Sequence, residues 1–265
     1  IEACQNDEDW YFFFNNKQYY TFEVSTDDGK VVKTVALNEE DALARANGFQ
    51  RITWNENFVS SVKVPYKAKE LWNYIWRHAI QSGDPGILNI DYIRSHTNVS
   101  YFEEIEVTNP CGEIPLPAYG NCCLGHVNLN HMVLEDGSDV DWKKLARTVR
   151  TGIRFLDNVL TINGFPLDEC KSAGHRSRRI GLGVTGLHYM LIKLGLKYGS
   201  NNSIEFVERL FTTIRNEAYI SSAYLARDKG PFPAFDRDKY LAQPFAKDLP
   251  ARIRMLIRQH GIRNA

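Results

Sequence analysis

Residues 109–117 read Asn-Pro-Cys-Gly-Glu-Ile-Pro-Leu-Pro, and this stretch decides how the middle of the chain can fold. Proline removes a backbone donor and disfavours the α conformation of the residue before it, so the stretch predicts an extended segment rather than a helix. Alternate side chains of an extended segment share a face, which would place Asn109, Cys111 and Glu113 together over roughly 7 Å, at about 3.3 Å per residue. An amide, a thiol and a carboxyl on one face form a candidate catalytic set.

A second thiol follows at Cys122, in the stretch Asn-Cys-Cys-Leu-Gly-His-Val-Asn-Leu at 121–129. The proline-rich segment and Tyr119-Gly120 predict a turn that sends the chain back, so Cys122 could lie near Cys111. We therefore predict that residues 109–129 form an active-site loop. A cysteine in a protein is more often a small apolar packing residue, and the motif alone leaves that interpretation open.

Residues 109–129 resemble the active-site loop of the large, catalytic subunit of ribonucleotide reductases. The Asn-Pro-Cys-Gly-Glu form is most similar to the adenosylcobalamin-dependent class II enzymes. Other segments of the chain are similar to the same family in the same order, namely 6–10, 82–91, 155–159, 179–187 and 230–236. The resemblance implies that residues 1–265 are the central part of the reductase catalytic barrel, with both ends of the enzyme missing.

This resemblance implies an α/β fold, a ten-stranded α/β barrel made of two five-stranded halves, with the Cys111 loop in its centre. It also implies radical-based reduction of ribonucleotides to 2′-deoxyribonucleotides, the precursors of DNA synthesis. Cys111 would carry a thiyl radical, Glu113 would act as general base and Asn109 would orient the ribose hydroxyls. Cys122 would be one of two redox-active thiols, and Asn109, Cys111, Gly112 and Glu113 would contact the substrate.

The same resemblance implies partners that the residues alone do not identify. The substrate would be a ribonucleoside di- or triphosphate, and a thioredoxin-like protein or another dithiol would be the reductant. The radical would come from adenosylcobalamin or, in a class I enzyme, from a separate metal-bearing subunit. The partner of Cys122 and the phosphate-binding loop would lie outside this chain, so we expect that the chain cannot turn over alone. A homodimer is a further expectation.

Composition limits the alternatives. The 265 residues are 43% hydrophobic and 24% charged, which is ordinary for a globular protein. Lys plus Arg and Asp plus Glu number 32 each, so no basic excess points to nucleic acid. The sequence contains no run of eighteen apolar residues, so it predicts no membrane-spanning helix. Five cysteines without a Cys-x-x-Cys pair favour a reducing cytoplasm and argue against a zinc site or other bound metal.

Local patterns predict further elements. Strand-like runs at 17–24 and 30–35 flank an Asp-Asp-Gly turn, and a helix opens at Asn38 and ends near Gly48. Together they would form a surface insertion within residues 10–50. Apolar spacing predicts helices and one short strand, namely helices 66–82, 140–163, 182–195 and 203–228 and the strand 87–90. Strands alternating with helices indicate an α/β architecture.

Several motifs have competing interpretations. Gly181-Leu182-Gly183-Val184-Thr185-Gly186 fits the dinucleotide pattern G-x-G-x-x-G, but polar and basic residues precede it, which favours glycines that allow close packing at a helix start. Arg176, Arg178 and Arg179 are expected on a solvated face. Cys123 stands where the family usually has Asn, whereas Cys4 and Cys170 are expected to be structural.

Two rival functions remain at this point. In a cysteine hydrolase, Cys111 would be the nucleophile and His126 its base, with Asn109 or Glu113 orienting the histidine. That function would have no cobalamin dependence and no role for Cys122. Alternatively, the chain would be a non-catalytic binding or assembly piece.

Overall fold

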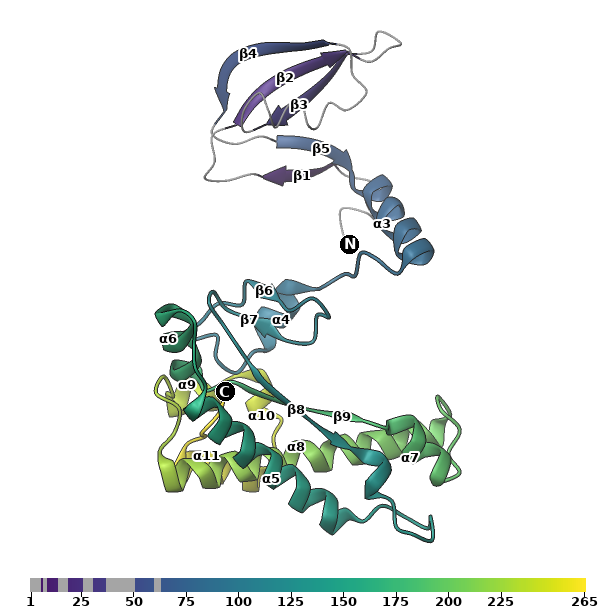
Figure 1. Cartoon of the computed structure of the whole chain (residues 1–265), viewed down its shortest axis with the longest axis vertical. Helices are drawn as coiled ribbons and strands as arrows, with labels where there is room; N and C mark the ends of the chain where they lie inside the picture. The colour runs from purple at the N-terminus through teal and green to yellow at the C-terminus, as the bar shows by residue number, and fades with distance from the viewer. Residues whose placement is uncertain (1–5, 7–8, 14–18, 26–30, 37–50, 60–62) are drawn as a thin grey trace. The chain divides into compact units, whose positions relative to one another are not determined.

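A computed structural model gives the backbone of residues 6, 9–13, 19–25, 31–36, 51–59 and 63–265, and the side chains of residue 6 and of residues 67–265. The chain divides into two compact units, Ile1–Ile87 and Leu88–Ala265 (Figure 1). Each unit has its own elements and is described by itself. The residues that carry the chemistry predicted above all belong to the second unit.

The described residues of the first unit form two antiparallel sheets and one helix. Its described elements are β1 (Asp9–Phe13), β2 (Tyr19–Ser25), β3 (Val31–Ala36), β4 (Arg51–Val59), β5 (Lys63–Lys67) and α3 (Ala68–Ser82). One sheet has the order β3-β2-β4 and the other pairs β1 with β5. The predicted hairpin is confirmed, because Ser25 of β2 pairs with Val31 of β3. Its Asp-Asp-Gly turn and the predicted helix from Asn38 lie outside the described residues.

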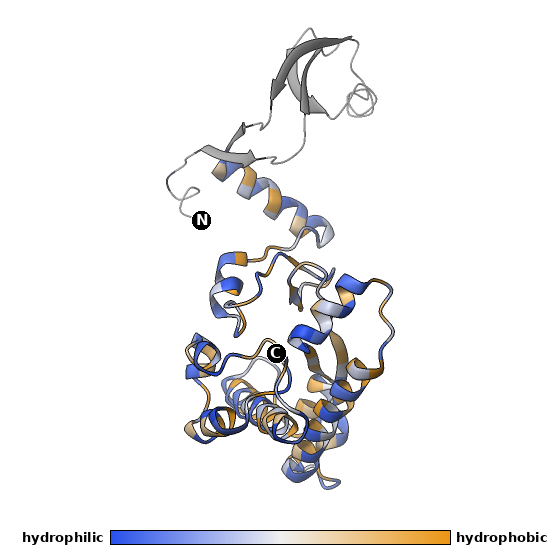
Figure 2. Cartoon of the chain, turned by 90° about the vertical axis from the view of Figure 1, so that its left-hand side faces the viewer, coloured by the Kyte–Doolittle hydropathy of each residue, from blue (hydrophilic) through white to orange (hydrophobic). Residues whose placement is uncertain are grey.

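Helix α3 confirms the prediction for residues 66–82, and Figure 2 shows its alternating apolar and polar residues. It ends at Gly83, whose φ of 84° is left-handed and whose N–H donates to the Ala79 carbonyl at 2.9 Å. The predicted strand at 87–90 is wrong: residues 84–89 form no strand, and Ile90 begins helix α4. No neighbouring strand pairs with this short apolar run, whose length alone does not distinguish strand from helix.

The second unit is a helical body around a short parallel sheet (Figure 1). Its strands are β6 (Val107–Thr108), β7 (Pro115–Leu116), β8 (Cys123–Asn128) and β9 (Ile180–Thr185). Its helices are α4 (Ile90–His96), the 3₁₀ turn η1 (Leu129–Met132), α5 (Trp142–Ile162), α6 (Asp168–Ser177), α7 (Leu187–Lys193), α8 (Asn201–Lys229), α9 (Arg237–Leu241), α10 (Pro244–Lys247) and α11 (Ala251–His260). Strands β6 and β7 pair antiparallel, whereas β8 and β9 pair in parallel.

Helix α5 is the element on which the parallel pair packs, and it confirms the helix predicted over 140–163. Asp141 caps its start by accepting a hydrogen bond from the Lys144 N–H at 2.9 Å. The predicted apolar face is buried along its whole length, through Leu145, Val149, Ile153, Leu156 and Leu160. Leu145 and Val149 join one core cluster with Val127 of β8 and Leu210 of α8.

Helix α8 confirms the prediction for 203–228 and contributes to both core clusters. The helix predicted over 182–195 is wrong in its first part. Residues 180–185 form β9, and only Leu187–Lys193 are helical after Gly186, whose φ is 73°. Apolar residues alternate at Ile180, Leu182 and Val184, and β8 supplies a parallel partner, so the strand forms instead.

The described residues support the predicted α/β class, because a parallel strand pair is connected through helices α5 and α6 and packed against α5. They form no closed barrel. Among the residues that the structure describes, no helix is both long and apolar enough to cross a bilayer.

Candidate active site

Three of the four predicted catalytic residues, Asn109, Cys111 and Glu113, lie in the six-residue loop of the β6–β7 hairpin, where Thr108 pairs with Pro115. The loop begins with a tight turn: the Gly112 N–H donates to the Asn109 carbonyl at 2.9 Å, and Gly112 has a left-handed φ of 80°. The extended geometry expected for 109–113 is therefore wrong. Proline at Pro110 and glycine at Gly112 favour a turn, since one fixes φ and the other accepts a positive φ.

Asn109 closes this loop from within. Its side-chain oxygen accepts a hydrogen bond from the Ile114 N–H at 2.9 Å, and its backbone N–H donates to the Ile114 carbonyl at 3.4 Å. The Thr108 hydroxyl donates to the Asn109 carbonyl at 3.0 Å. The amide nitrogen of Asn109 has no partner among the described residues, so two N–H donors remain for a ligand.

Cys111 and Glu113 are exposed within the same loop, and Cys111 is a free thiol. Gly112 between them is close to Leu88, because a Cβ added at Gly112 would lie 3.6 Å from a Leu88 methyl. The structure thus brings the four predicted substrate-binding residues, Asn109, Cys111, Gly112 and Glu113, into one loop. Exposure gives the thiol and the carboxyl access to a ligand.

Cys122 follows a second turn, as the sequence predicted. The Gly120 N–H donates to the Pro117 carbonyl at 2.9 Å, and Tyr119 between them has a positive φ of 56°. Cys122 is half-buried, and burial followed by the neighbouring Cys123 raises the pKa of its thiol to about 12. The four described cysteines are free thiols, and no disulfide or hydrogen bond joins Cys111 to Cys122. Their expected proximity stays a prediction.

The β8–β9 pair has two different faces, and the two neighbouring thiols lie on opposite ones. A Cβ added at Gly181 would meet Leu124 and Cys122, and one at Gly183 would meet His126. On the other face, a Cβ at Gly125 would meet Leu156 of α5. Since side chains alternate along a strand, Cys122 and His126 share the face away from α5, and Cys123 points to the α5 side.

The glycines of the G-x-G-x-x-G pattern therefore allow close packing, as expected. The expected place was a helix start, and most of the packing is instead found along a strand. Gly181 and Gly183 lie within strand β9, and only Gly186 lies at a helix start. A Cβ at Gly186 would come 2.7 Å from the Asn128 side-chain oxygen. Gly181 and Gly183 therefore leave room for the Cys122, Leu124 and His126 side chains on the face of the strand pair away from α5.

A buried ionic cluster forms around Asp157 of α5, the helix on which the β8–β9 pair packs. Asp157 of α5 is fully buried, and its carboxylate accepts hydrogen bonds from Arg178 at 2.7 Å, Lys229 at 3.0 Å and Arg263 at 3.1 Å. Asn264 adds a fourth donor at 3.2 Å. Burial raises the pKa of Asp157, but the hydrogen bonds from Arg178 and Lys229 outweigh it and bring that pKa below its usual range.

The expectation that the three arginines line a solvated face is wrong for two of them. Arg178 is buried against Asp157, and Arg179 forms an ion pair with Glu103 in which both side chains are largely buried. Arg176 is exposed, with its guanidinium 5.1 Å from the centre of the Phe102 ring. The overlooked signal was Asp157 itself, an acid between Leu156 and Leu160 on the buried face of α5, which requires buried cations.

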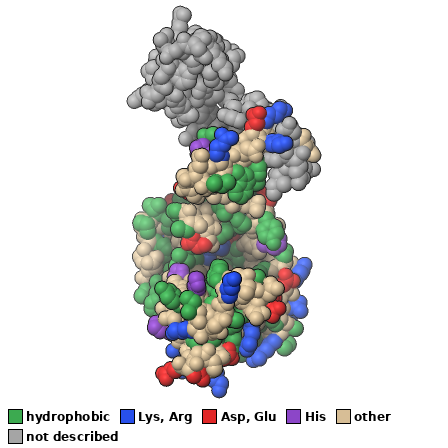
Figure 3. Space-filling view, turned by 90° about the vertical axis from the view of Figure 1, so that its right-hand side faces the viewer, with side chains coloured by type: hydrophobic (Ala, Val, Ile, Leu, Met, Phe, Trp, Pro, Cys, Tyr) green, Lys and Arg blue, Asp and Glu red, His purple; other side chains and the backbone are tan. Residues whose placement is uncertain are grey.

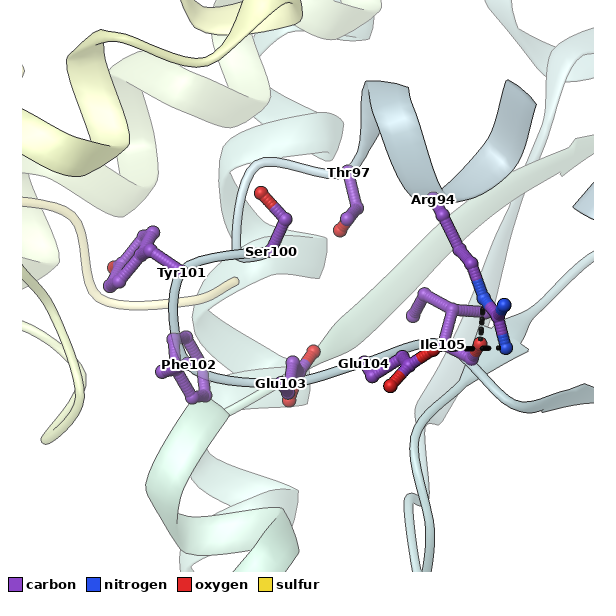
Figure 4. A pocket seen from close by; sticks show the side chains of 8 residues that line it. All are labelled: Arg94, Thr97, Ser100, Tyr101, Phe102, Glu103, Glu104 and Ile105. Carbon is purple, nitrogen blue, oxygen red and sulfur yellow. Dashed lines mark hydrogen bonds and ion pairs between the residues drawn. The ribbon is translucent and has the colours of Figure 1, made fainter. Parts of the chain in front are cut away.

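A cavity of about 470 Å³ lies along the segment that leads into β6. Figure 4 shows Arg94 of α4 reaching toward this segment, where its Nε donates to the Ile105 carbonyl at 2.7 Å and its guanidinium lies 3.3 Å from Glu104. The hydroxyls of Thr97 and Ser100 also line it. These contacts fix the chain just before the β6–β7 hairpin.

The hydrolase interpretation gains nothing from this geometry. His126 packs over Gly183, and no hydrogen bond connects it to Cys111 among the described residues. The part of the chain with described side chains contains no group of three or more His, Cys, Asp or Glu that could hold a metal ion. The face in Figure 3 mixes basic, acidic and apolar side chains, in keeping with the balanced charge.

The chain is similar to known proteins over most of its length. The family model of the ribonucleotide reductase barrel domain matches residues 1–265. A vitamin B12-dependent ribonucleoside-diphosphate reductase from Thermoplasma acidophilum is 41% identical over 64% of this chain and 22% of its own length. One from Mycobacterium tuberculosis is 38% identical over 78% of this chain and 30% of its own length. The alpha subunit of the Chlamydia muridarum ribonucleoside-diphosphate reductase is 32% identical over 75% of this chain and 21% of its own length.

The aligned part of this chain spans between a fifth and a third of the length of these relatives. The family model matches the whole chain, and the hairpin loop presents the Asn-Pro-Cys-Gly-Glu residues that suggested the family. The chain therefore belongs to the ribonucleotide reductase barrel-domain family, with similarity to the vitamin B12-dependent enzymes of that family.

Proposed function

We propose that this chain carries the radical and acid–base residues of a ribonucleotide reductase that converts ribonucleotides to 2′-deoxyribonucleotides. The observation that carries the proposal is the hairpin loop that presents an exposed thiol, an exposed carboxyl and an internally fixed amide within five residues, 109–113. The names of the relatives support a ribonucleoside diphosphate as the substrate. The cysteine usage favours a cytoplasmic enzyme.

The roles of the loop residues follow from their chemistry. A sulfur radical on Cys111 takes the 3′ hydrogen atom of the ribose, which forms an S–H bond and leaves the unpaired electron on C3′. Glu113 takes the proton of the 3′-hydroxyl as general base. The free amide nitrogen of Asn109 donates to the ribose hydroxyls while its oxygen stays bonded to Ile114. The C3′ radical makes departure of the 2′-hydroxyl feasible.

Two thiols supply the reducing equivalents that the reaction consumes. Cys122 and a partner thiol supply two electrons and two protons, the 2′-hydroxyl leaves as water, and the sulfurs end as a disulfide. Cys111 then returns its hydrogen atom to C3′. The net change converts one ribonucleotide and two thiols into one deoxyribonucleotide, one water and one disulfide. An external dithiol, such as a thioredoxin-like protein, would reduce that disulfide.

We further propose that the two described units belong to a ten-stranded barrel with the Cys111 loop at its centre. The parallel β8–β9 pair supports this, because both its strands have a free edge among the described residues, and Leu124, His126 and Asn128 on the face away from α5 are exposed. Residues 10–50 would then form a surface insertion. The enzyme would act as a homodimer completed by segments that this chain does not supply.

Adenosylcobalamin is the radical source that the names of the vitamin B12-dependent relatives support. The cobalt of a cobalamin is held by its own corrin ring, so its binding needs no cluster of metal-ligating side chains from the protein. None of the described residues is identified as a contact to the cofactor, and no step is assigned to it. The alpha subunit of the Chlamydia muridarum enzyme keeps the class I alternative open, in which a separate metal-bearing subunit supplies the radical.

The test uses the complete enzyme, with a ribonucleotide and a dithiol, with and without adenosylcobalamin. We expect deoxyribonucleotide only when cobalamin is present, and none from a Cys111→Ser variant under the same conditions. Product that requires a metal-bearing subunit instead would move the enzyme to class I. Deoxyribonucleotide made by the isolated 265-residue chain would refute the expectation that this chain cannot turn over alone.

A further inference from the structure

We infer that Gly181 is a positioning residue for the Cys122 thiol, because the missing side chain at Gly181 leaves the space in which Cys122 Sγ lies. The inference rests on the proposed function, in which Cys122 is a reducing thiol. It assigns a role in the reaction to strand β9, which contains none of the residues with predicted chemistry.

The contact is short. A Cβ added at Gly181 would lie 3.3 Å from Cys122 Sγ and 2.6 Å from a methyl of Leu124. The first distance is tighter than an ordinary contact between carbon and sulfur, and the second cannot occur without movement. Leu124 is 46% exposed and can move into solvent, whereas Cys122 is half-buried and has less room.

Packing, rather than hydrogen bonding, determines where this thiol lies. The only hydrogen bond of Cys122 Sγ among the described residues runs to the Cys123 carbonyl at 3.9 Å, and a thiol is a weak donor. The position of Cys122 Sγ therefore depends on the backbone of β8 and on its packing against Gly181 of β9. A methyl group at position 181 would change that packing directly.

The effect should be specific to one of the two neighbouring thiols. Cys123 points to the α5 side, where Arg178 lies, and a methyl at position 181 would project on the opposite face. A disulfide requires a sulfur–sulfur distance near 2.05 Å and a dihedral angle near 90°, as is general for disulfides. A small displacement of Cys122 Sγ therefore slows disulfide formation more than it weakens substrate binding.

The experiment uses the complete enzyme and four variants. Gly181→Ala introduces the methyl, and Gly181→Ala combined with Leu124→Ala removes the contact with Leu124 and keeps the methyl beside the thiol. Gly183→Ala is the matched control, because its methyl would meet His126 and not the thiol. Leu124→Ala alone corrects the double variant for the loss of the leucine.

Two readouts are needed. The first is alkylation of Cys122 by iodoacetamide between about pH 7 and 10, followed by peptide mass mapping with Cys123 as the internal reference; it needs no substrate or turnover. The second is the rate of Cys122 disulfide formation in a single turnover. We expect Gly181→Ala and the double variant to slow Cys122 alkylation and Cys122 disulfide formation about tenfold each, because the added methyl is forced into a packed site. KM and the rate of Cys123 alkylation should stay unchanged.

Two results would overturn the inference. Wild-type rates in the double variant would show that Leu124, not the thiol, responds to the methyl. An equal effect of Gly183→Ala would show a general disturbance of β9. If the wild-type enzyme makes no deoxyribonucleotide at all, the proposed function fails, and the alkylation rates still decide whether Gly181 positions Cys122.

Discussion

The side-chain oxygen of Asn109 accepts a hydrogen bond from the Ile114 backbone N–H at 2.9 Å, across the turn that carries Cys111. The amide thus has two separate functions available to it: its oxygen holds the loop, and its nitrogen remains free for a ligand. This division explains how an exposed loop can present a thiol and a carboxyl in a defined arrangement.

Substitutions at Asn109 should separate the two functions. Asn109→Asp keeps an acceptor for Ile114 but loses the N–H donors, so we expect an intact loop and deoxyribonucleotide formation lowered by about 10- to 100-fold, equivalent to about 1–3 kcal/mol. Asn109→Ala should also raise the hydrogen exchange rate of the Ile114 amide. Product assays and exchange measured by mass spectrometry check both. Equal exchange in the two variants would contradict the assignment.

The Asp157 cluster should dominate the stability of the second unit. Asp157→Asn keeps the shape of the side chain but leaves Arg178, Lys229 and Arg263 without their shared anion. Breaking one partner out of a buried ion pair costs about 3–5 kcal/mol. Asp228→Asn is the matched control, because Asp228 pairs with Arg227 on the surface, where solvent screens the pair and its contribution to stability is small. Urea unfolding midpoints measure the loss of stability in both variants. Similar shifts for Asp157→Asn and Asp228→Asn would contradict a dominant role of the Asp157 cluster.

The same carboxylate predicts acid sensitivity. The folded-state pKa of Asp157 lies below its usual value, despite burial, because Arg178 and Lys229 donate to it. A group with a lowered pKa stabilises the fold fully above its unfolded pKa of about 3.9, and this contribution is lost as pH falls through the folded pKa. We expect the melting temperature to fall less steeply below about pH 4 in Asp157→Asn than in the wild type. Parallel profiles would contradict this.

Cys122 should remain protonated at neutral pH. Burial and the neighbouring Cys123 raise its pKa to about 12, and the thiolate is the form that reacts with alkylating reagents. In the wild-type enzyme, Cys122 alkylation should therefore rise about tenfold per pH unit between about pH 7 and 10. A plateau below pH 10 would show that the thiol ionises more readily. Cys122→Ser identifies the modified peptide.

Periodicity predicted the long elements well. The spacing of Leu145, Val149 and Leu156 defined α5, because a helix that covers a sheet must have one continuous apolar face. It could not distinguish strand from helix at Leu182 and Val184, because that choice depends on β8, a strand distant in sequence that pairs with this segment. The buried state of Arg178 likewise depends on Asp157, twenty-one residues earlier.

The motif singled out the residues of the candidate catalytic loop, but it did not predict the shape of that loop. Asn109, Cys111 and Glu113 were singled out from residue type and spacing, and all three lie in the hairpin loop. The turn at Gly112 and the bond from Ile114 to Asn109 depend on the pairing of β6 with β7, which two-residue strands do not reveal in a sequence. The opposite directions of Cys122 and Cys123 became apparent only from the packing against α5.

The central claim is that Cys111 takes the 3′ hydrogen atom of the ribose. The most direct measurement compares deoxyribonucleotide formation from ordinary and 3′-deuterated ribonucleotide in the complete enzyme, with Cys111→Ser as the control. We predict slower single-turnover reduction of the deuterated substrate by the wild type and no product from Cys111→Ser. Reduction by Cys111→Ser at the wild-type rate would contradict the account.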